Sequence, residues 1–437
     1  MTAANRRPPA LPSSRNTMRL TLPNGIALLL RENPASPAVV VSGYLEVGRQ
    51  DEPAHLRGLS NYVADAVERG SQHRPFDVLY EQIEEIAATF AVRSGAHITS
   101  FGGRCLADAL PIILEILGEV LRQPAFEPDQ VEKCRTEILT SLQEREHSTT
   151  RLAGLIFNNL TYPESHPYHW SGLGYRETVE RISREDVIDF HTRHYGPNGM
   201  TVAIVGGIQI QDTIHAVESV FADWRAERVP RAPVPNVPPL PERREKRVLV
   251  EDKTQANLVL GWPGPERRHA DFMSAFVTNT LLGVYGLHGR LGKRLREQSG
   301  LAYYAYSQID GGMGPGPWRI LSGVASNAIE RAVDLIRDEL RLLRDVPVDP
   351  DELSDVQSFL TGSLPMHLET NEGVARALIN MERYGLGLDY LEEYSSLVNS
   401  VTIGDVQTIA NRWLDPDCFA LAVAQPTANP KAGQLSC

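Results

Sequence analysis

The feature of this sequence that most limits its fold is an internal repeat. Residues 126–142 (FEPDQVEKCRTEILTSL) and 348–364 (VDPDELSDVQSFLTGSL) both place a proline at an expected helix start, followed by acidic residues and apolar residues at helical spacing. Helix N-termini favour this order. Residues 182–206 and 401–425 each read as a helix, a proline-containing turn and an apolar strand. The sequence therefore predicts two diverged copies of one unit.

A proline-rich stretch separates the two copies. Residues 225–247 (RAERVPRAPVPNVPPLPERREKR) contain six prolines, which remove backbone donors and favour an extended linker. The 437 residues are enough for two domains that each bury a core. The predicted organisation is a flexible leader at 1–17, a first domain at 18–224, the linker at 225–247, a second domain at 248–426 and a tail at 427–437.

Strand and helix patterns are mixed within each copy. An Asn-Gly turn and an apolar strand occupy residues 22–32, and a second strand is expected at 38–48. Apolar residues recur at helical spacing in 57–70 and 106–124. The predicted fold class is α+β, with two homologous repeats. Each repeat is expected to be an antiparallel-rich sheet with helices packed on one face.

Composition argues against several classes of function. Acidic residues number 55 against 43 basic ones, so the net charge of -12 argues against nucleic acids and anionic membranes as partners. No apolar run approaches the roughly 20 residues of a membrane-spanning helix. The four cysteines form no Cys-x-x-Cys pair, which argues against a thiolate zinc site. The N-terminal residues lack the apolar core of a secretory signal. A soluble cytoplasmic protein is expected, and a periplasmic one would need a signal peptide that has been removed.

Residues 47–71 (VGRQDEPAHLRGLSNYVADAVERGS) resemble the pitrilysin/insulinase (M16) metallopeptidase family, in which this stretch carries a His-x-x-Glu-His motif. The resemblance continues through residues 166–207 (HPYHWSGLGYRETVERISREDVIDFHTRHYGPNGMTVAIVGG) and covers nearly the whole chain in the expected order. It implies the LuxS/MPP-like α+β fold. A length of about two repeats resembles the two-chain branch of the family.

The zinc motif of the family is degenerate in this chain. Two histidines one helical turn apart bind the ion, and the glutamate beside the second is the general base. The matching residues are Asn61, Ala64 and Asp65, and the resemblance matches Glu137 with the third ligand. Asparagine is a weak zinc ligand, one aspartate does not replace two imidazoles, and Ala64 removes the base. We therefore expect no metal at these positions, and zinc only in a partner subunit.

Two further histidine pairs have i, i+3 spacing, His166 with His169 and His191 with His194. His166 lies in a Pro-Tyr turn, whereas His191 and His194 lie near a helix C-terminus, where a cationic ring interacts favourably with the helix dipole. No carboxylate or cysteine is placed to complete either site. A structural role is expected for both pairs.

Residues 290–307 (RLGKRLREQSGLAYYAYS) resemble a second-half segment of the family, in which an arginine precedes a tyrosine by seven residues. The matching residues are Arg296 and Tyr303, and Gly300 is expected to end the intervening helix in the left-handed conformation. The resemblance implies that the pair donates hydrogen bonds to the substrate carbonyl, a role that suits guanidinium and phenol groups facing an oxyanion. The structural alternative makes Arg296 a surface charge and Tyr303 a core aromatic residue.

Loss of the metal ligands and retention of Arg296 and Tyr303 together predict a function. The chain would be the non-catalytic subunit of a heterodimeric zinc metallopeptidase that cleaves peptides or unfolded polypeptides in a chamber between subunits. Its partner would be a homologous subunit with an intact His-x-x-Glu-His motif, and the Arg/Tyr pair would act in trans. Two alternatives stay open: a structural core-type homologue without proteolysis, and a peptide-binding homodimer without metal.

Overall fold

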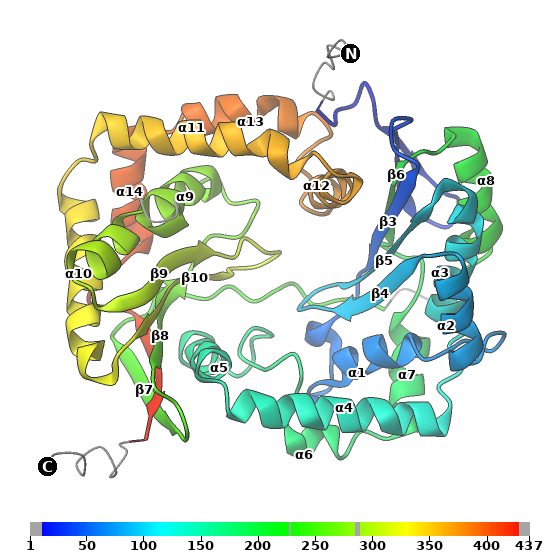
Figure 1. Ribbon diagram of the computed structural model, residues 1–437, viewed down its shortest axis with the longest axis horizontal. Helices are drawn as coiled ribbons and strands as arrows, with labels where there is room; N and C mark the ends of the chain where they lie inside the picture. Colours follow the sequence, from blue (N-terminus) through cyan, green and yellow to red (C-terminus); the bar gives the residue numbers. More distant parts are fainter. Residues whose placement is uncertain (1–10, 227–228, 285–288, 428–437) are drawn as a thin grey trace, which may run out of the picture. The chain divides into compact units, whose positions relative to one another are not determined.

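The computed structural model describes residues 11–226, 229–284 and 289–427, which divide into two compact units (Figure 1). Unit 1 takes the described residues up to Ile138, together with Gly172–Arg231 and Gly362–Ser395. Unit 2 takes Leu139–Ser171, Ala232–Thr361 and the described residues from Ser396 onward. Each unit is therefore assembled from three stretches of chain, which differs from the contiguous domains at 18–224 and 248–426 expected from the sequence.

Unit 1 is built on a six-stranded sheet in the order β1-β2-β6-β3-β5-β4. Its strands are β1 (Met18–Thr21), β2 (Ala27–Glu32), β3 (Ala38–Leu45), β4 (Thr89–Ser94), β5 (Thr99–Leu106) and β6 (Thr201–Gly206). Strands β2 and β6 are parallel, and the other neighbours are antiparallel. The strands predicted within 22–32 and 38–48 are confirmed as β2 and β3.

Unit 2 repeats this topology in a five-stranded sheet of order β7-β11-β8-β10-β9. Its strands are β7 (Arg244–Val250), β8 (Ala256–Pro263), β9 (Ala302–Ile309), β10 (Pro317–Val324) and β11 (Ala420–Pro426). Strands β7 and β11 are parallel, and the other pairs are antiparallel. Without β1, the strand order and the parallel or antiparallel pairing in unit 1 match those in unit 2. The predicted duplication and the antiparallel-rich α+β class are confirmed.

The helices also follow the predicted repeat. The α-helices that lie wholly in unit 1 are α1 (Leu59–Val67), α2 (Phe76–Glu85), α3 (Leu110–Arg122), α6 (Arg176–Val179), α7 (Arg184–His194), α8 (Ile210–Phe221) and α12 (Asn371–Arg383). The α- and π-helices of unit 2 are α5 (Thr149–Thr161), α9 (Phe272–Asn279), η4 (Thr280–Val284), η6 (Gly292–Gln298), α10 (Ile329–Asp345) and α14 (Ile403–Trp413). The unit boundaries fall within α4 (Pro128–Glu146), α11 (Pro350–His367) and α13 (Tyr390–Asn399). Helices α4 and α11 both begin at a proline, as the repeat predicted.

Each sheet is covered by a helix from the other half of the sequence. In unit 1, α3 and α8 lie on one face, and α12 covers the other through Leu378 and its neighbours, which pack on Val40 and Tyr44 (Figure 1). In unit 2, α5 packs Phe157 against the small residues of β11, such as Ala422. The sequence predicted helices on one face only. A second helical layer is needed because the central strands β6 and β11 are apolar on both faces, and leaving either face in water would be costly.

The segments outside the two sheets differ in part from expectation. Residues 229–243 form no helix or strand, as the linker predicted, but Arg244 begins β7, so 244–247 belong to the sheet. Residues 11–17 of the predicted leader are held in place. Leu11 packs against the hydrophobic residues between α12 and the sheet, and the backbone N–H of Ser14 donates to Asp389 Oδ1 at 2.8 Å. Residues 1–10 and 428–437 lie outside the described residues. In the described ranges, no helix is long and apolar enough to span a bilayer.

Candidate functional site

Helix α1, which carries the degenerate motif, is anchored at its N-terminus by a buried carboxylate. Glu52 accepts hydrogen bonds from the backbone N–H groups of Gly58 and Ser60, at 3.1 and 2.9 Å, and from the Ser60 hydroxyl at 2.8 Å. These donors would otherwise be orphaned at the helix start. Burial raises the pKa of Glu52, although its three hydrogen bonds act in the opposite direction. The carboxylate therefore fixes the first turn of α1.

Two of the three motif positions on α1, Asn61 and Asp65, are hydrogen-bonded to each other. Asn61 Nδ2 donates to Asp65 Oδ2 at 2.9 Å, which confirms that the two residues share a helix face. Ala64 is buried and brings no carboxylate to that face. In the described part of the chain, no group of three histidine, cysteine, aspartate or glutamate side chains is arranged to hold a metal ion. The residues present do not fit a zinc ion.

Glu137, the fourth motif position, is brought next to α1 but is engaged elsewhere. It lies on α4, and its carboxylate accepts a hydrogen bond from the guanidinium of Arg69, just after the end of α1. The buried Cys134 lies one turn earlier on α4, where burial raises the pKa of its thiol to about 11. A thiol with that pKa stays protonated at neutral pH and is a poor zinc ligand. The structure therefore brings Glu137 to the end of α1, where it is paired with Arg69.

Asp65 allows a direct test of how strongly this region disfavours charge. Burial, and to a smaller extent the nearby Glu68 carboxylate, raise the pKa of Asp65 to about 6. Because the folded pKa exceeds the unfolded value near 4, the carboxylate costs stability progressively as pH rises from about 4 to 6 and fully above that. Asp65→Asn should raise the free energy of unfolding by about 2 kcal/mol at pH 7.5 and barely change it at pH 3.5.

Urea denaturation of Asp65→Asn and the parent chain at both pH values checks this expectation. The matched control is Glu81→Gln, an exposed site on α2, which should change neither value. An equal effect of Asp65→Asn at pH 7.5 and pH 3.5 would show that the charge of this carboxylate is not what costs stability.

Three of the four histidines in the two further pairs contact backbone carbonyls. His166 accepts a hydrogen bond at Nδ1, so its Nε2 donates to the Pro235 carbonyl at 3.1 Å. His169 Nδ1 and His191 Nε2 also lie within 2.7 and 2.9 Å of backbone carbonyls. Burial lowers the pKa of His191 to about 4, so its ring is neutral at physiological pH. These contacts support the structural role that the sequence predicted.

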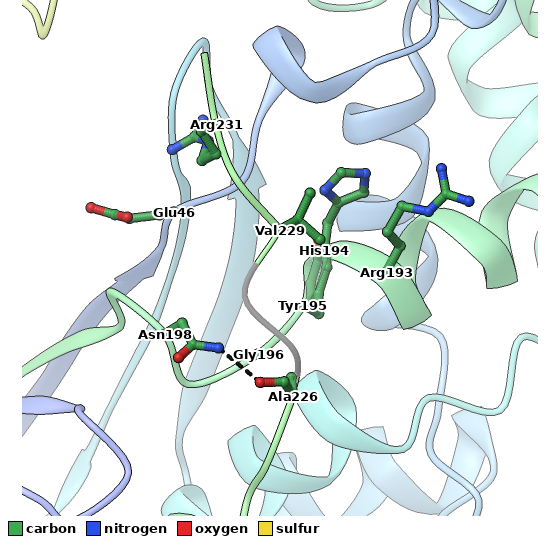
Figure 2. A pocket seen from close by; sticks show the side chains of 9 residues that line it. All are labelled: Glu46, Arg193, His194, Tyr195, Gly196, Asn198, Ala226, Val229 and Arg231. Atoms are coloured by element: carbon green, nitrogen blue, oxygen red, sulfur yellow. Dashed lines mark hydrogen bonds between the residues drawn. The ribbon is translucent and has the colours of Figure 1, made fainter. Parts of the chain in front are cut away.

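A pocket of about 110 Å³ lies in unit 1 at the end of α7, and Figure 2 shows the side chains that line it. Two of its polar side chains are already paired. Asn198 Nδ2 donates to the Ala226 carbonyl at 2.9 Å, and the Arg231 guanidinium makes two hydrogen bonds to Asp51, at 3.0 and 2.9 Å. Burial also lowers the pKa of His194 on its wall. None of the four motif positions is among the described lining residues, so the pocket is separate from the motif.

In unit 2, the Arg/Tyr segment folds as predicted locally. Arg296 lies on η6, and Gly300 follows with a φ of 62° and donates its N–H to the Arg296 carbonyl at 3.1 Å. The left-handed helix end is therefore confirmed. Both Arg296 and Tyr303 are exposed, Tyr303 by 65%. The alternative in which Tyr303 is a core aromatic residue is wrong. Neither side chain forms a hydrogen bond or ion pair with another described residue.

Tyr303 owes its position to an irregularity that the sequence did not reveal. On the edge strand β9, Tyr304 pairs with Gly323 of β10 and Ala302 with Val324, so Tyr303 is the extra residue of a β-bulge. Bulges re-aim side chains at strand ends. The side chain of the next residue, Tyr304, is held in place because its hydroxyl donates to Asn257 Oδ1 on β8. A bulge depends on pairing with another strand, so local sequence carries no signal for it.

The protein contains two copies of one α+β unit, and the first copy carries a degenerate His-x-x-Glu-His motif. This architecture is that of a metallopeptidase. Comparison with protein families agrees. Residues 27–163 match the family described as insulinase (peptidase family M16), and residues 181–360 match the peptidase M16 inactive domain. The chain belongs to peptidase family M16.

Several known proteins are similar over much of the chain. It is 23% identical to the uncharacterized zinc protease YmxG of Bacillus subtilis, covering 94% of this chain and 98% of that protein. It is 23% identical to a probable mitochondrial-processing peptidase subunit beta of Arabidopsis thaliana, covering 65% of this chain and 53% of that protein. It is 26% identical to cytochrome b-c1 complex subunit 1 of Rattus norvegicus, covering 63% of this chain and 57% of that protein.

The fold has a close match among solved structures. The crystal structure of a peptidase M16 inactive domain from Pseudomonas fluorescens superposes with a TM-score of 0.86 at 21% identity, covering 94% of this chain and 98% of that chain. At this level of identity the match establishes the shared fold. The two-repeat architecture expected from the resemblance is therefore confirmed.

Proposed function

We propose that this chain is the non-catalytic subunit of a two-chain zinc peptidase. A homologous partner with an intact His-x-x-Glu-His motif would hold the zinc. This chain would contribute Arg296 and Tyr303, which donate hydrogen bonds to the carbonyl of a peptide or unfolded polypeptide under attack. Water attack turns that carbonyl into an oxyanion, which preorganised donors stabilise.

The observation that carries this proposal is the exposure of Tyr303 on an edge strand. A tyrosine kept for packing would be buried, whereas this one is 65% exposed and held at a bulge. The pairing of Asn61 with Asp65 and of Glu137 with Arg69 supports the absence of a metal centre in this chain. Similarity to a peptidase subunit beta supports a role as one subunit of an assembly.

A structural subunit without proteolysis is the second candidate, favoured by similarity to cytochrome b-c1 complex subunit 1. That role, like a peptide-binding homodimer, needs neither Arg296 nor Tyr303. Substitution of Tyr303 in the assembled complex therefore separates these candidates from the proposed one.

The purified chain alone should hold no stoichiometric zinc and cleave no peptide, because its motif offers Asn61, Ala64 and Asp65 where two histidines and a base are required. Peptidase activity should appear when it is mixed with a homologue that carries the intact motif. Elemental analysis and a fluorogenic peptide assay measure the two properties, with the homologue alone as the control. Detection of about one zinc per chain that is lost on substituting Asp65 or Glu137 would contradict the proposal.

A further inference from the structure

The end of α1 carries an arginine that the resemblance did not single out. Arg69 follows Asp65 by one helical turn, and its guanidinium forms an ion pair with Glu137 of α4. The same guanidinium lies 5.3 Å from the centre of the Phe76 ring on α2 and interacts with the Cys134 thiol. One side chain thus links the end of α1 to α2 and to the part of α4 that belongs to unit 1.

Besides its ion pair with Glu137, this guanidinium acts electrostatically on two carboxylates at the end of α1, those of Asp65 and Glu68. A second arginine, Arg93 on β4, pairs with Glu68 from the outer side. The Arg69 side chain is 21% exposed against 63% for Arg93, so Arg69 is the more sheltered cation. The Glu137 side chain is 59% exposed, so water screens this ion pair from the Glu137 side only.

We infer that Arg69 supplies, from within the chain, the positive charge that a bound metal ion would supply at the motif of a zinc-binding relative, and that it ties α1 to α4 through Glu137. The Glu137 carboxylate, which matches the third zinc ligand of the family, is thereby paired with the Arg69 guanidinium. Restoring the two histidines would not by itself restore a tight site, because zinc would have to displace a cation from Glu137. This inference concerns only residues of unit 1 and does not depend on the proposed partner.

Zinc titration tests the inference directly. The probes are two variants of the full chain, Asn61→His/Asp65→His and the same pair with Arg69→Met, which removes the charge and keeps an unbranched, flexible side chain. Zinc should bind at least about tenfold more tightly when Arg69 is replaced, as isothermal titration against a competing chelator measures. The matched control adds Arg93→Met instead, and should leave the affinity within about twofold. Equal affinities with and without Arg69 would overturn the inference.

A second measurement, on chains without added histidines, guards against variants that fail to bind zinc. Arg69→Met and Glu137→Gln should each lower the melting temperature by about 2 °C, and the double variant should be no less stable than Arg69→Met alone. Such non-additivity marks a direct pairing, whereas a solvated surface contact would give losses near zero. Full additivity, or a melting temperature of Arg69→Met equal to that of the parent chain, would also overturn the inference.

Discussion

Replacing Tyr303 by phenylalanine should lower kcat of the assembled peptidase by about two to three decades. Losing one donor to a developing oxyanion typically costs roughly 3 to 4 kcal/mol, and this change removes only the hydroxyl. The side chain is 65% exposed and bonds to no other described residue, so the fold should be unaffected. Steady-state kinetics on a peptide, with the variant mixed with a homologous zinc-binding subunit, gives kcat and KM separately.

The matched control is Tyr306→Phe, an exposed tyrosine on the same strand, which should leave kcat within about twofold. Assembly with the partner should persist for both variants, and KM should change far less than kcat for Tyr303→Phe, as for a contact made mainly in the transition state. Arg296→Ala should also lower kcat, but it deletes packing as well as charge. If Tyr303→Phe retains kcat within about twofold, the structural-subunit role becomes the better explanation.

Substituting Arg290 by methionine should destabilise unit 2 by about 3 kcal/mol, which urea denaturation measures. Arg290 makes a two-pronged contact with Glu352, at 2.8 and 2.7 Å, and reaches Glu339 at 3.4 Å. The Arg290 and Glu339 side chains are only 17% and 10% exposed. Burial already raises the pKa of Glu339, and Arg290 counters that effect. Without the arginine, a buried carboxylate loses its main partner.

Two further variants make the Arg290 test specific. Glu339→Gln in the Arg290→Met background should recover part of the lost stability, since it removes the unpaired charge. Lys293→Met, on the exposed side of η6, should cost little. A loss below about 1 kcal/mol for Arg290→Met would mean that water screens the network. Lys293→Met also serves as the neutral reference for substitutions of Arg296.

The sequence by itself determined the elements of this protein and their repetition. Helix spacing, first-turn prolines and Asn-Gly turns act within a few residues, so α4, α11 and the strands β2 and β3 were predictable from local patterns. The same holds for the shared helix face of Asn61 and Asp65, because one helical turn fixes which side chains lie on the same face.

Only the tertiary structure decided how those elements are shared. Nothing in the spacing of apolar residues says which sheet an amphipathic helix covers, so the assignment of α5 to unit 2 and α12 to unit 1 could not be predicted. Likewise, the pairing of Arg69 with Glu137 and the bulge at Tyr303 join residues that are distant in sequence or lie on neighbouring strands. Such contacts form because packing brings the elements together. The pattern of apolar residues in the sequence shows which face of each element is buried, but not which element packs against it.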